Sequence, residues 1–171
     1  MSVLTESDDI QAVIENIRKA PFADRKNIFL MGESQGGVAS TIAASKAPKE
    51  IRAMVLLYPA YVLFDDAKNK YPHKDMIEDI SMVFGLPVGR KYYEDAFSLD
   101  ISDCMKKYDR NVLILHGNID QVVPMSYSLD ARKKFPAAKI IQITDAGHVF
   151  YGKEVVKAGK EMISFIQENM D

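Results

Sequence analysis

Short apolar runs alternate with amphipathic stretches along most of the chain. Four runs are too short for helices and are bounded by glycine, proline or polar residues, which predicts buried strands at residues 27–31, 51–58, 111–116 and 138–143. Helical patterns cover residues 7–19, 38–44, 126–135 and 153–170. We expect the first of these helices to be introduced by a capping box of Thr5 and Asp8. Apolar strands alternating with helices predict an α/β fold, with a mostly parallel sheet and helices on both faces.

Residues 61–100 interrupt this alternation. The segment is polar and aromatic, and residues 83–90 have the glycine and proline content of a short hairpin. Connections of this length inside an α/β domain are uncommon and often form lids or binding loops. We therefore expect residues 1–171 to form one domain in which residues 61–100 are a cap over one edge of the sheet.

The composition is that of an ordinary globular chain. Lys and Arg together number 22 against 24 Asp and Glu, a net charge of −2 that provides no general attraction to nucleic acid or to an anionic membrane. A single cysteine, Cys104, forms no internal disulfide, and no Cys/His spacing is typical of a metal site. We expect a cytoplasmic protein without a signal peptide, and without a metal or other cofactor.

A candidate nucleophile lies between the first predicted strand and the helix after it. Residues 32–36 read GESQG and match the pattern G-x-S-x-G in the strand-turn-helix context that this motif requires. Glycines on both sides give a sharp turn room to expose the Ser34 hydroxyl. The backbone N–H of Gln35, at the start of the helix, is a candidate oxyanion donor.

A serine nucleophile needs a base and an acid that orients the base. Asp120 follows the third predicted strand, and His148 follows the fourth, so both are expected at the sheet edge that carries Ser34. Their order, Ser–Asp–His, is that of the α/β-hydrolases. His116 and His73 are alternative bases, although a structural role is expected for His116 at its strand end and a surface position for His73.

Three segments together resemble the serine α/β-hydrolases, in particular the cinnamoyl/feruloyl-esterase-like members. They are the serine turn GESQG at residues 32–36, the run HGNIDQVVP at residues 116–124 and GHVF at residues 147–150. The resemblance covers nearly the whole chain. It implies a carboxylesterase for small acyl or aromatic (cinnamoyl-type) esters, with Ser34 as nucleophile, Asp120 as acid and His148 as base. It also suggests Asp65, Tyr92 and Tyr93 in the cap as substrate-binding residues.

Compared with that family, the sequence starts at the helix before the serine turn. The family's other oxyanion donor comes from a loop with a His-Gly dipeptide, and no such dipeptide precedes Ser34, so this donor has no source in the sequence. Losing one donor costs about 10²–10³ in kcat. A catalytically weak or inactive remnant that acts as a binding module therefore remains an alternative, as do a peptidase and a thioesterase. The apolar strand at residues 27–31 would lack one neighbour, which predicts a homodimer or higher assembly through this edge.

Overall fold

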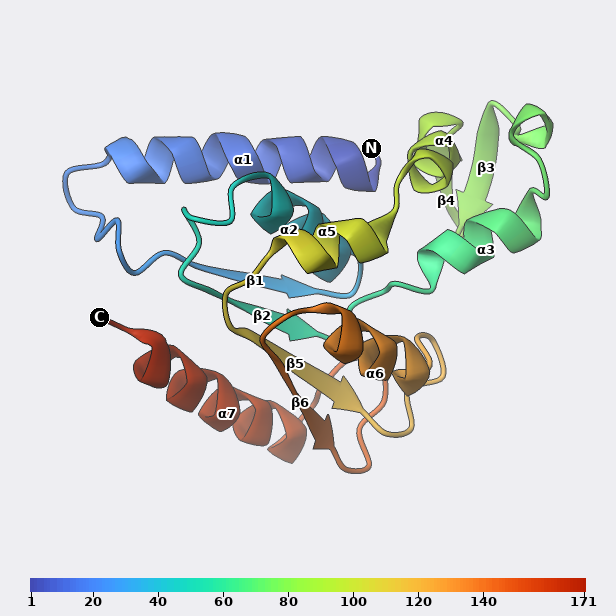
Figure 1. Ribbon diagram of the computed structural model, residues 1–171. Helices are drawn as coiled ribbons and strands as arrows, with labels where there is room; N and C mark the ends of the chain where they lie inside the picture. Colours follow the sequence, from blue (N-terminus) through green and yellow to red (C-terminus); the bar gives the residue numbers. More distant parts are fainter.

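A parallel four-stranded sheet lies at the centre of the computed structural model, which describes residues 1–171 (Figure 1). Its strand order is β1-β2-β5-β6, and each neighbouring pair is parallel. The strands are β1 (Phe29–Glu33), β2 (Ala53–Leu57), β5 (Val112–Gly117) and β6 (Ala138–Ile143). The predicted α/β fold with a parallel sheet is confirmed, and the carboxyl ends of all four strands share one edge.

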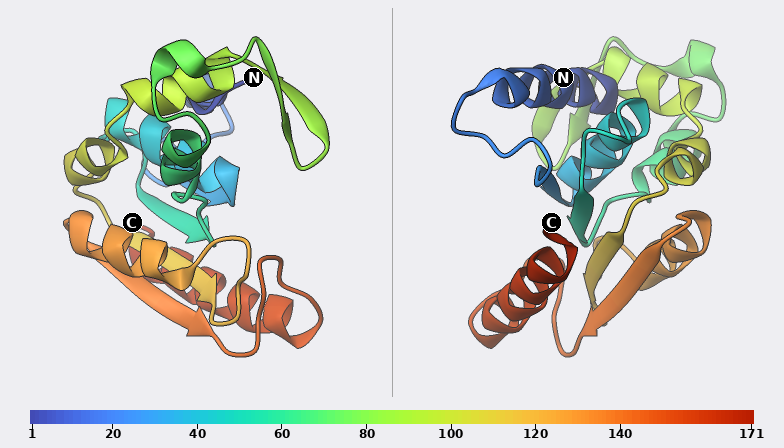
Figure 2. Two further views of the ribbon diagram at one scale, coloured as in Figure 1. Left: turned by 90° about the vertical axis from the view of Figure 1, so that its right-hand side faces the viewer. Right: turned by 60° about the vertical axis from the view of Figure 1, so that its left-hand side comes forward.

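Helices cover both faces of this sheet (Figures 1 and 2). The layer on one face is formed by α1 (Val3–Lys19), α2 (Gln35–Lys46), α5 (Ile101–Lys107) and α6 (Met125–Lys134), and α7 (Lys153–Asn169) lies on the other face. Successive strand residues point to opposite faces of the sheet. Met54 therefore packs in the hydrophobic core on the face covered by α2, and Val55 packs in the core on the face covered by α7. No helix combines the length and apolar content needed to cross a bilayer.

Several predicted boundaries differ from the structure, by one to four residues. Helix α1 begins four residues before the predicted start, because Ser2 rather than Thr5 is the N-cap; the Ser2 hydroxyl accepts from Thr5 N–H, and Thr5 Oγ1 accepts from Ser2 N–H. Strand β1 begins and ends two residues later than predicted, so it runs directly into the turn at Ser34. The helix and strand themselves are as expected.

The segment predicted as a cap folds into small elements beside the main sheet (Figure 2). Along the chain these are α3 (Leu63–Lys70), the 3₁₀ helix η1 (Lys74–Met76), β3 (Ile80–Val83), β4 (Leu86–Gly89) and α4 (Lys91–Ser98). Strands β3 and β4 pair antiparallel, as the hairpin prediction required, and helix α3 packs against α4. The cap also contacts the amino-terminal end of α1 through α4.

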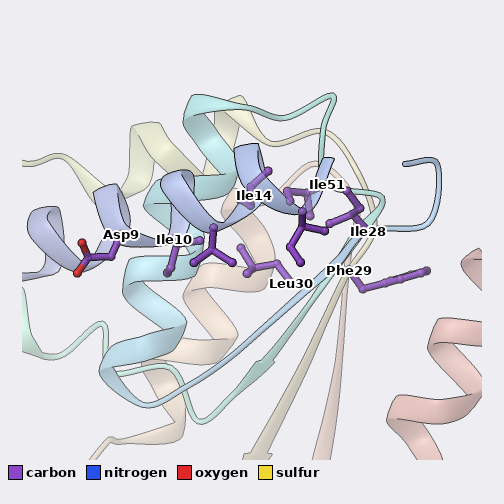
Figure 3. Close-up of a pocket in the computed structure, with 9 residues that line it drawn as sticks. Asp9, Ile10, Ile14, Ile28, Phe29, Leu30 and Ile51 are labelled. Atoms are coloured by element: carbon purple, nitrogen blue, oxygen red, sulfur yellow. The ribbon is translucent and has the colours of Figure 1, made fainter. Parts of the chain in front are cut away.

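Strand β1 is an edge strand, paired with β2 on one side only. Beside it a hollow of about 360 Å³ lies between α1 and β1 (Figure 3). Asp9 is its one charged lining residue, and the others are apolar: Ile10, Val13, Ile14, Ile17, Ile28, Phe29, Leu30 and Ile51. We call this hollow the α1–β1 groove.

Candidate active site

Ser34 occupies a strained turn between β1 and α2. Its φ of 49° and ψ of −123° are unusual for a residue with a side chain. The surrounding backbone holds this conformation: Ser34 N–H donates to Leu57 O at 3.0 Å, and its carbonyl accepts from Gly37 N at 3.0 Å and Ala60 N at 2.9 Å. The hydroxyl therefore has a fixed place at the start of α2.

Gly32 explains why the turn can be so tight. A Cβ at this position would collide with the Gly36 backbone carbonyl and the Ser40 hydroxyl. The first glycine of the motif thus lets α2 pack directly against the end of β1, which carries Ser34 over the carboxyl edge of the sheet.

The three residues predicted as a triad lie within hydrogen-bond reach of one another. Ser34 Oγ is 3.0 Å from His148 Nε2, and His148 Nδ1 is 2.9 Å from Asp120 Oδ2. The Asp120 side chain is fully buried, whereas 17% of the His148 side chain remains exposed. Because Nδ1 faces a carboxylate that only accepts, it carries the proton, and Nε2 is free to accept from the serine hydroxyl.

The loop after β5 holds the Asp120 carboxylate. Its Oδ1 accepts from the backbone N–H groups of Val122 and Val123, each at 2.9 Å. The other oxygen, Oδ2, faces His148. These two donors satisfy the buried oxygen and fix the orientation of the carboxylate.

The two alternative histidines lie elsewhere. His116 is fully buried at the end of β5 and contacts Ser128 and Val123 rather than Ser34. Burial lowers the pKa of His116, with a partial opposing effect from its Val123 and Asp120 contacts. His73 is exposed in the cap, next to η1. His148 is thus the histidine positioned to act on Ser34.

Tyr58, which the sequence patterns did not single out, packs against His148. Its ring lies 4.8 Å from the His148 ring, centroid to centroid, and 4.9 Å from that of Phe150 in an edge-on arrangement. Its hydroxyl donates to Glu33 Oε2 at 2.8 Å. Burial raises the pKa of Tyr58, and the hydrogen bond to Glu33 raises it further. A positive φ of 37° directs the chain sharply after β2. Tyr58 therefore connects the base loop to the serine turn.

The side chain of Gln35 links the turn to two other elements. Its Nε2 donates to Glu6 Oε1 on α1 at 2.7 Å, and its Oε1 accepts from the Tyr92 hydroxyl on α4 at 3.0 Å. Burial raises the pKa of Glu6 and of Tyr92. Gln35 is the first residue of α2, so its backbone N–H belongs to the helix end that has no acceptor within the helix. This is the N–H that the sequence predicts as an oxyanion donor.

A cavity of about 710 Å³ opens above Ser34 and His148, between the sheet edge and the cap. Most of its wall is apolar and comes from the start of α3, the β3–β4 hairpin and the loop after Asp120: Val62, Leu63, Met82, Val83, Phe84 and Val122. The cap supplies four polar groups to it: Asp66, Lys70, Tyr92 and Tyr93. A mainly apolar pocket with a few polar groups is typical of a small-molecule site. We call it the reactive cavity.

The structure corrects one predicted cap residue. Asp65 does not line the reactive cavity; its carboxylate accepts from the Tyr127 hydroxyl of α6 at 2.7 Å. The neighbouring Asp66 lines the cavity instead, because successive helix residues point about 100° apart. Tyr92 and Tyr93 do lie at the cavity, although Tyr93 is largely buried and its hydroxyl accepts from Lys70 Nζ at 3.3 Å.

The fold and this serine turn define an α/β-hydrolase. A family model for the prolyl oligopeptidase family matches residues 4–171, and the chain belongs to that family. No curated protein matches the sequence.

Several solved structures share the fold. Est1E from Butyrivibrio proteoclasticus superimposes with a TM-score of 0.89 at 24% identity, over 98% of this chain and 72% of its own. Est1E with ferulic acid bound gives the same TM-score and identity, over 99% of this chain and 69% of its own. The monoacylglycerol lipase of Paleococcus ferrophilus gives 0.73 at 17% identity, over 99% of this chain and 77% of its own.

Proposed function

We propose that this protein is a serine carboxylesterase acting on small acyl or aromatic, cinnamoyl-type esters. The observation that carries the proposal is the continuous hydrogen-bond chain from Ser34 Oγ through His148 to Asp120 Oδ2, at 3.0 Å and 2.9 Å. Ser34 and His148 line the reactive cavity, whose size and polarity suit a small organic ester. The ferulic acid bound to Est1E, a protein of the same fold, supports an aromatic acyl group.

In the proposed reaction, Ser34 Oγ attacks the ester carbonyl carbon while His148 Nε2 takes the hydroxyl proton. The Gln35 N–H, at the positive end of α2, donates to the oxyanion that forms. The tetrahedral intermediate then collapses, and His148 gives the proton to the departing alcohol. His148 then takes a proton from a water molecule, whose oxygen attacks the acyl-enzyme carbonyl carbon. As the second tetrahedral intermediate collapses, the carboxylic acid leaves and His148 returns the proton to Ser34 Oγ. Asp120 stabilises the imidazolium in both stages.

The cap selects the substrate in this proposal. An aromatic acyl group would lie against the apolar wall formed by the start of α3 and the hairpin. The Asp66 carboxylate and the tyrosine hydroxyls at the cavity are the groups available to a phenolic hydroxyl. Such contacts would act equally on bound substrate and transition state, and so would set KM and substrate choice more than kcat.

The test is the hydrolysis of p-nitrophenyl acetate and methyl ferulate by the unmodified protein and by Ser34→Ala. Ser164→Ala is a matched control, because Ser164 is exposed on α7 and contacts only Glu168. The proposal expects turnover by the unmodified protein and by the control, and none by Ser34→Ala. Equal rates for all three proteins would remove Ser34 from the reaction, and no turnover by any of them would favour a binding module.

A peptidase is a second candidate because the chain belongs to the prolyl oligopeptidase family. The same serine, histidine and aspartate would then cleave an amide rather than an ester. Peptidyl p-nitroanilides with proline before the scissile bond, assayed beside the esters, separate the two candidates. A higher kcat/KM for the anilide than for the esters would replace the esterase proposal. A coenzyme A thioester assayed in the same way tests for thioesterase activity.

A further inference from the structure

His116 is a buried histidine next to the loop after β5 that carries Asp120, which we call the acid loop. Its side chain is fully buried, and both ring nitrogens have partners. Nδ1 lies 2.7 Å from the Ser128 hydroxyl on α6, and Nε2 lies 2.9 Å from the Val123 carbonyl oxygen. The same Nε2 is 3.3 Å from Asp120 Oδ2, the oxygen that faces His148.

The partners of His116 determine its tautomer. The Val123 carbonyl and the Asp120 carboxylate only accept hydrogen bonds, so the ring proton is on Nε2. Nδ1 then accepts from the Ser128 hydroxyl. Burial lowers the pKa of His116 and favours this neutral form. The ring thus donates its N–H to the Val123 carbonyl, beside Asp120 Oδ2, and accepts from the Ser128 hydroxyl on α6.

A histidine that only filled space here would not need this arrangement. Asp120 Oδ1 is satisfied by two backbone N–H groups, whereas Oδ2 otherwise has only the His148 N–H. The His116 N–H donates to the Val123 carbonyl at the far end of the loop, and its nitrogen also lies 3.3 Å from Oδ2. One side chain therefore restrains both the loop and the carboxylate that orients the base.

Gly117 extends the connection to the base. A Cβ at this position would collide with the backbone carbonyl of Ala146, so the loop that leads to His148 packs directly against the end of β5. Ile119 N–H also donates to Ala146 O at 3.1 Å. The loop that carries Asp120 and the loop that carries His148 are thus held together immediately beside His116.

We propose that His116 is a positioning residue for the reaction: through its Nε2–H it holds the Asp120 carboxylate in the place where that carboxylate orients His148. This inference rests on the proposed function and places a fourth side chain beside Ser34, His148 and Asp120. His116 touches neither Ser34 nor the reactive cavity. Its effect on the reaction passes through Asp120 and through the loop that holds Asp120, whose residue Val123 lines that cavity.

Two substitutions separate positioning from space filling. His116→Gln keeps an amide N–H donor near the place of Nε2, whereas His116→Leu keeps the bulk and removes the donor. With a p-nitrophenyl ester we expect His116→Leu to lower kcat by about 10- to 100-fold with little change in KM, as loss of a hydrogen bond to a charged group implies. We expect His116→Gln to recover most of that loss.

The titration of His148 supplies a readout that is independent of activity. The groups facing His148 are Ser34, Asp120 and the Tyr58 ring, and those facing His116 are Asp120, Ser128 and the Val123 carbonyl. With ¹⁵N-labelled histidine, the three histidines of the chain can be followed separately by NMR from pH 5 to pH 9. A displaced Asp120 stabilises the imidazolium less, so His116→Leu should move the His148 titration to lower pH, and His116→Gln should restore it.

The outcomes separate the two proposals. If the unmodified protein hydrolyses no ester, the proposed function fails, but the NMR titration still tests the positioning role. If His116→Leu folds and leaves both kcat and the His148 titration unchanged, the positioning role is wrong. If His116→Leu does not fold, Ser128→Ala, which removes only the hydroxyl that holds Nδ1, should shift the His148 titration in the same direction by a smaller amount. An unchanged titration in Ser128→Ala would then overturn the inference.

Discussion

Two hollows of the molecule, the reactive cavity and the α1–β1 groove, both have apolar walls but differ in their polar groups. The reactive cavity is framed at its base by Ser34 and His148 and is covered by a cap with four polar groups. The α1–β1 groove has one charged residue, Asp9, and lies beside a strand without a second neighbour. An apolar hollow provides binding area, but chemistry requires polar groups that the fold holds at fixed distances. Only the reactive cavity has such groups, so the two hollows should respond to different substitutions.

The largest expected effect is on the reactive cavity. Ser34→Ala should lower kcat for a p-nitrophenyl ester by about 10⁶-fold, because removing the nucleophile disables the whole triad. The fold and any self-association should be unchanged, since the substitution removes one hydroxyl. Stopped assays over hours, with far-UV circular dichroism for folding, measure this. If the kcat of Ser34→Ala were within tenfold of the kcat of the unmodified protein, the reactive cavity would not depend on Ser34 for its chemistry.

Asp120→Asn should lower kcat by about 10⁴-fold. The amide keeps the shape of the carboxylate but favours the wrong tautomer of His148. Asp130→Asn is the control, because Asp130 is an exposed α6 residue whose partner is Lys133. Comparable losses in both variants would indicate a general effect of removing a negative charge, and the acid would then lie elsewhere.

The cap allows a matched comparison of adjacent residues. Asp66 lines the cavity and Asp65 does not, so Asp66→Asn should raise KM for methyl ferulate by about tenfold with kcat unchanged, and Asp65→Asn should have little effect. Methyl cinnamate, which lacks the phenolic hydroxyl, should be affected by neither change. If Asp65→Asn had the larger effect, the cap helix would be oriented differently during binding.

The α1–β1 groove should govern self-association and not hydrolysis. An unpaired apolar edge strand is a template for another strand, and we expect a homodimer or higher assembly that covers β1. Val13 is 61% exposed in the groove and Val155 is 51% exposed on α7, so Val13→Glu should weaken association at least tenfold and Val155→Glu should not. Sedimentation velocity tests this, and a monomer at 100 μM unmodified protein would refute it.

Acid should destabilise the protein partly through His116. Burial lowers the folded-state pKa of His116 below its ordinary value near 6.5, so the unfolded chain binds a proton that the folded chain resists. The contribution of this group to the unfolding free energy is therefore constant above about pH 6.5 and falls as the pH drops from there towards the lowered pKa. Urea unfolding at pH 7.5 and 5.5 should show a smaller difference for His116→Gln than for the unmodified protein.

Sequence patterns predicted the reactive cavity unevenly. Ser34, Asp120 and His148 could be found because each follows a short apolar run that forms a strand, and parallel strands bring their carboxyl ends to one edge. The cap residues could not be assigned in this way, because α3 is short and its two adjacent aspartates differ only in the face they occupy. Tyr58 and the Glu6–Gln35–Tyr92 contacts depend on packing between distant elements, which no local pattern encodes.

The most direct test of the account is covalent labelling by a fluorophosphonate, which reacts with an activated serine and requires no knowledge of the natural substrate. Intact-mass measurement followed by peptide mapping should show one label per chain at Ser34, and no label on Ser34→Ala. Labelling at Ser34 should also be strongly slowed in Asp120→Asn. An unlabelled, folded protein, or equal labelling of the unmodified protein and Ser34→Ala, would contradict the account.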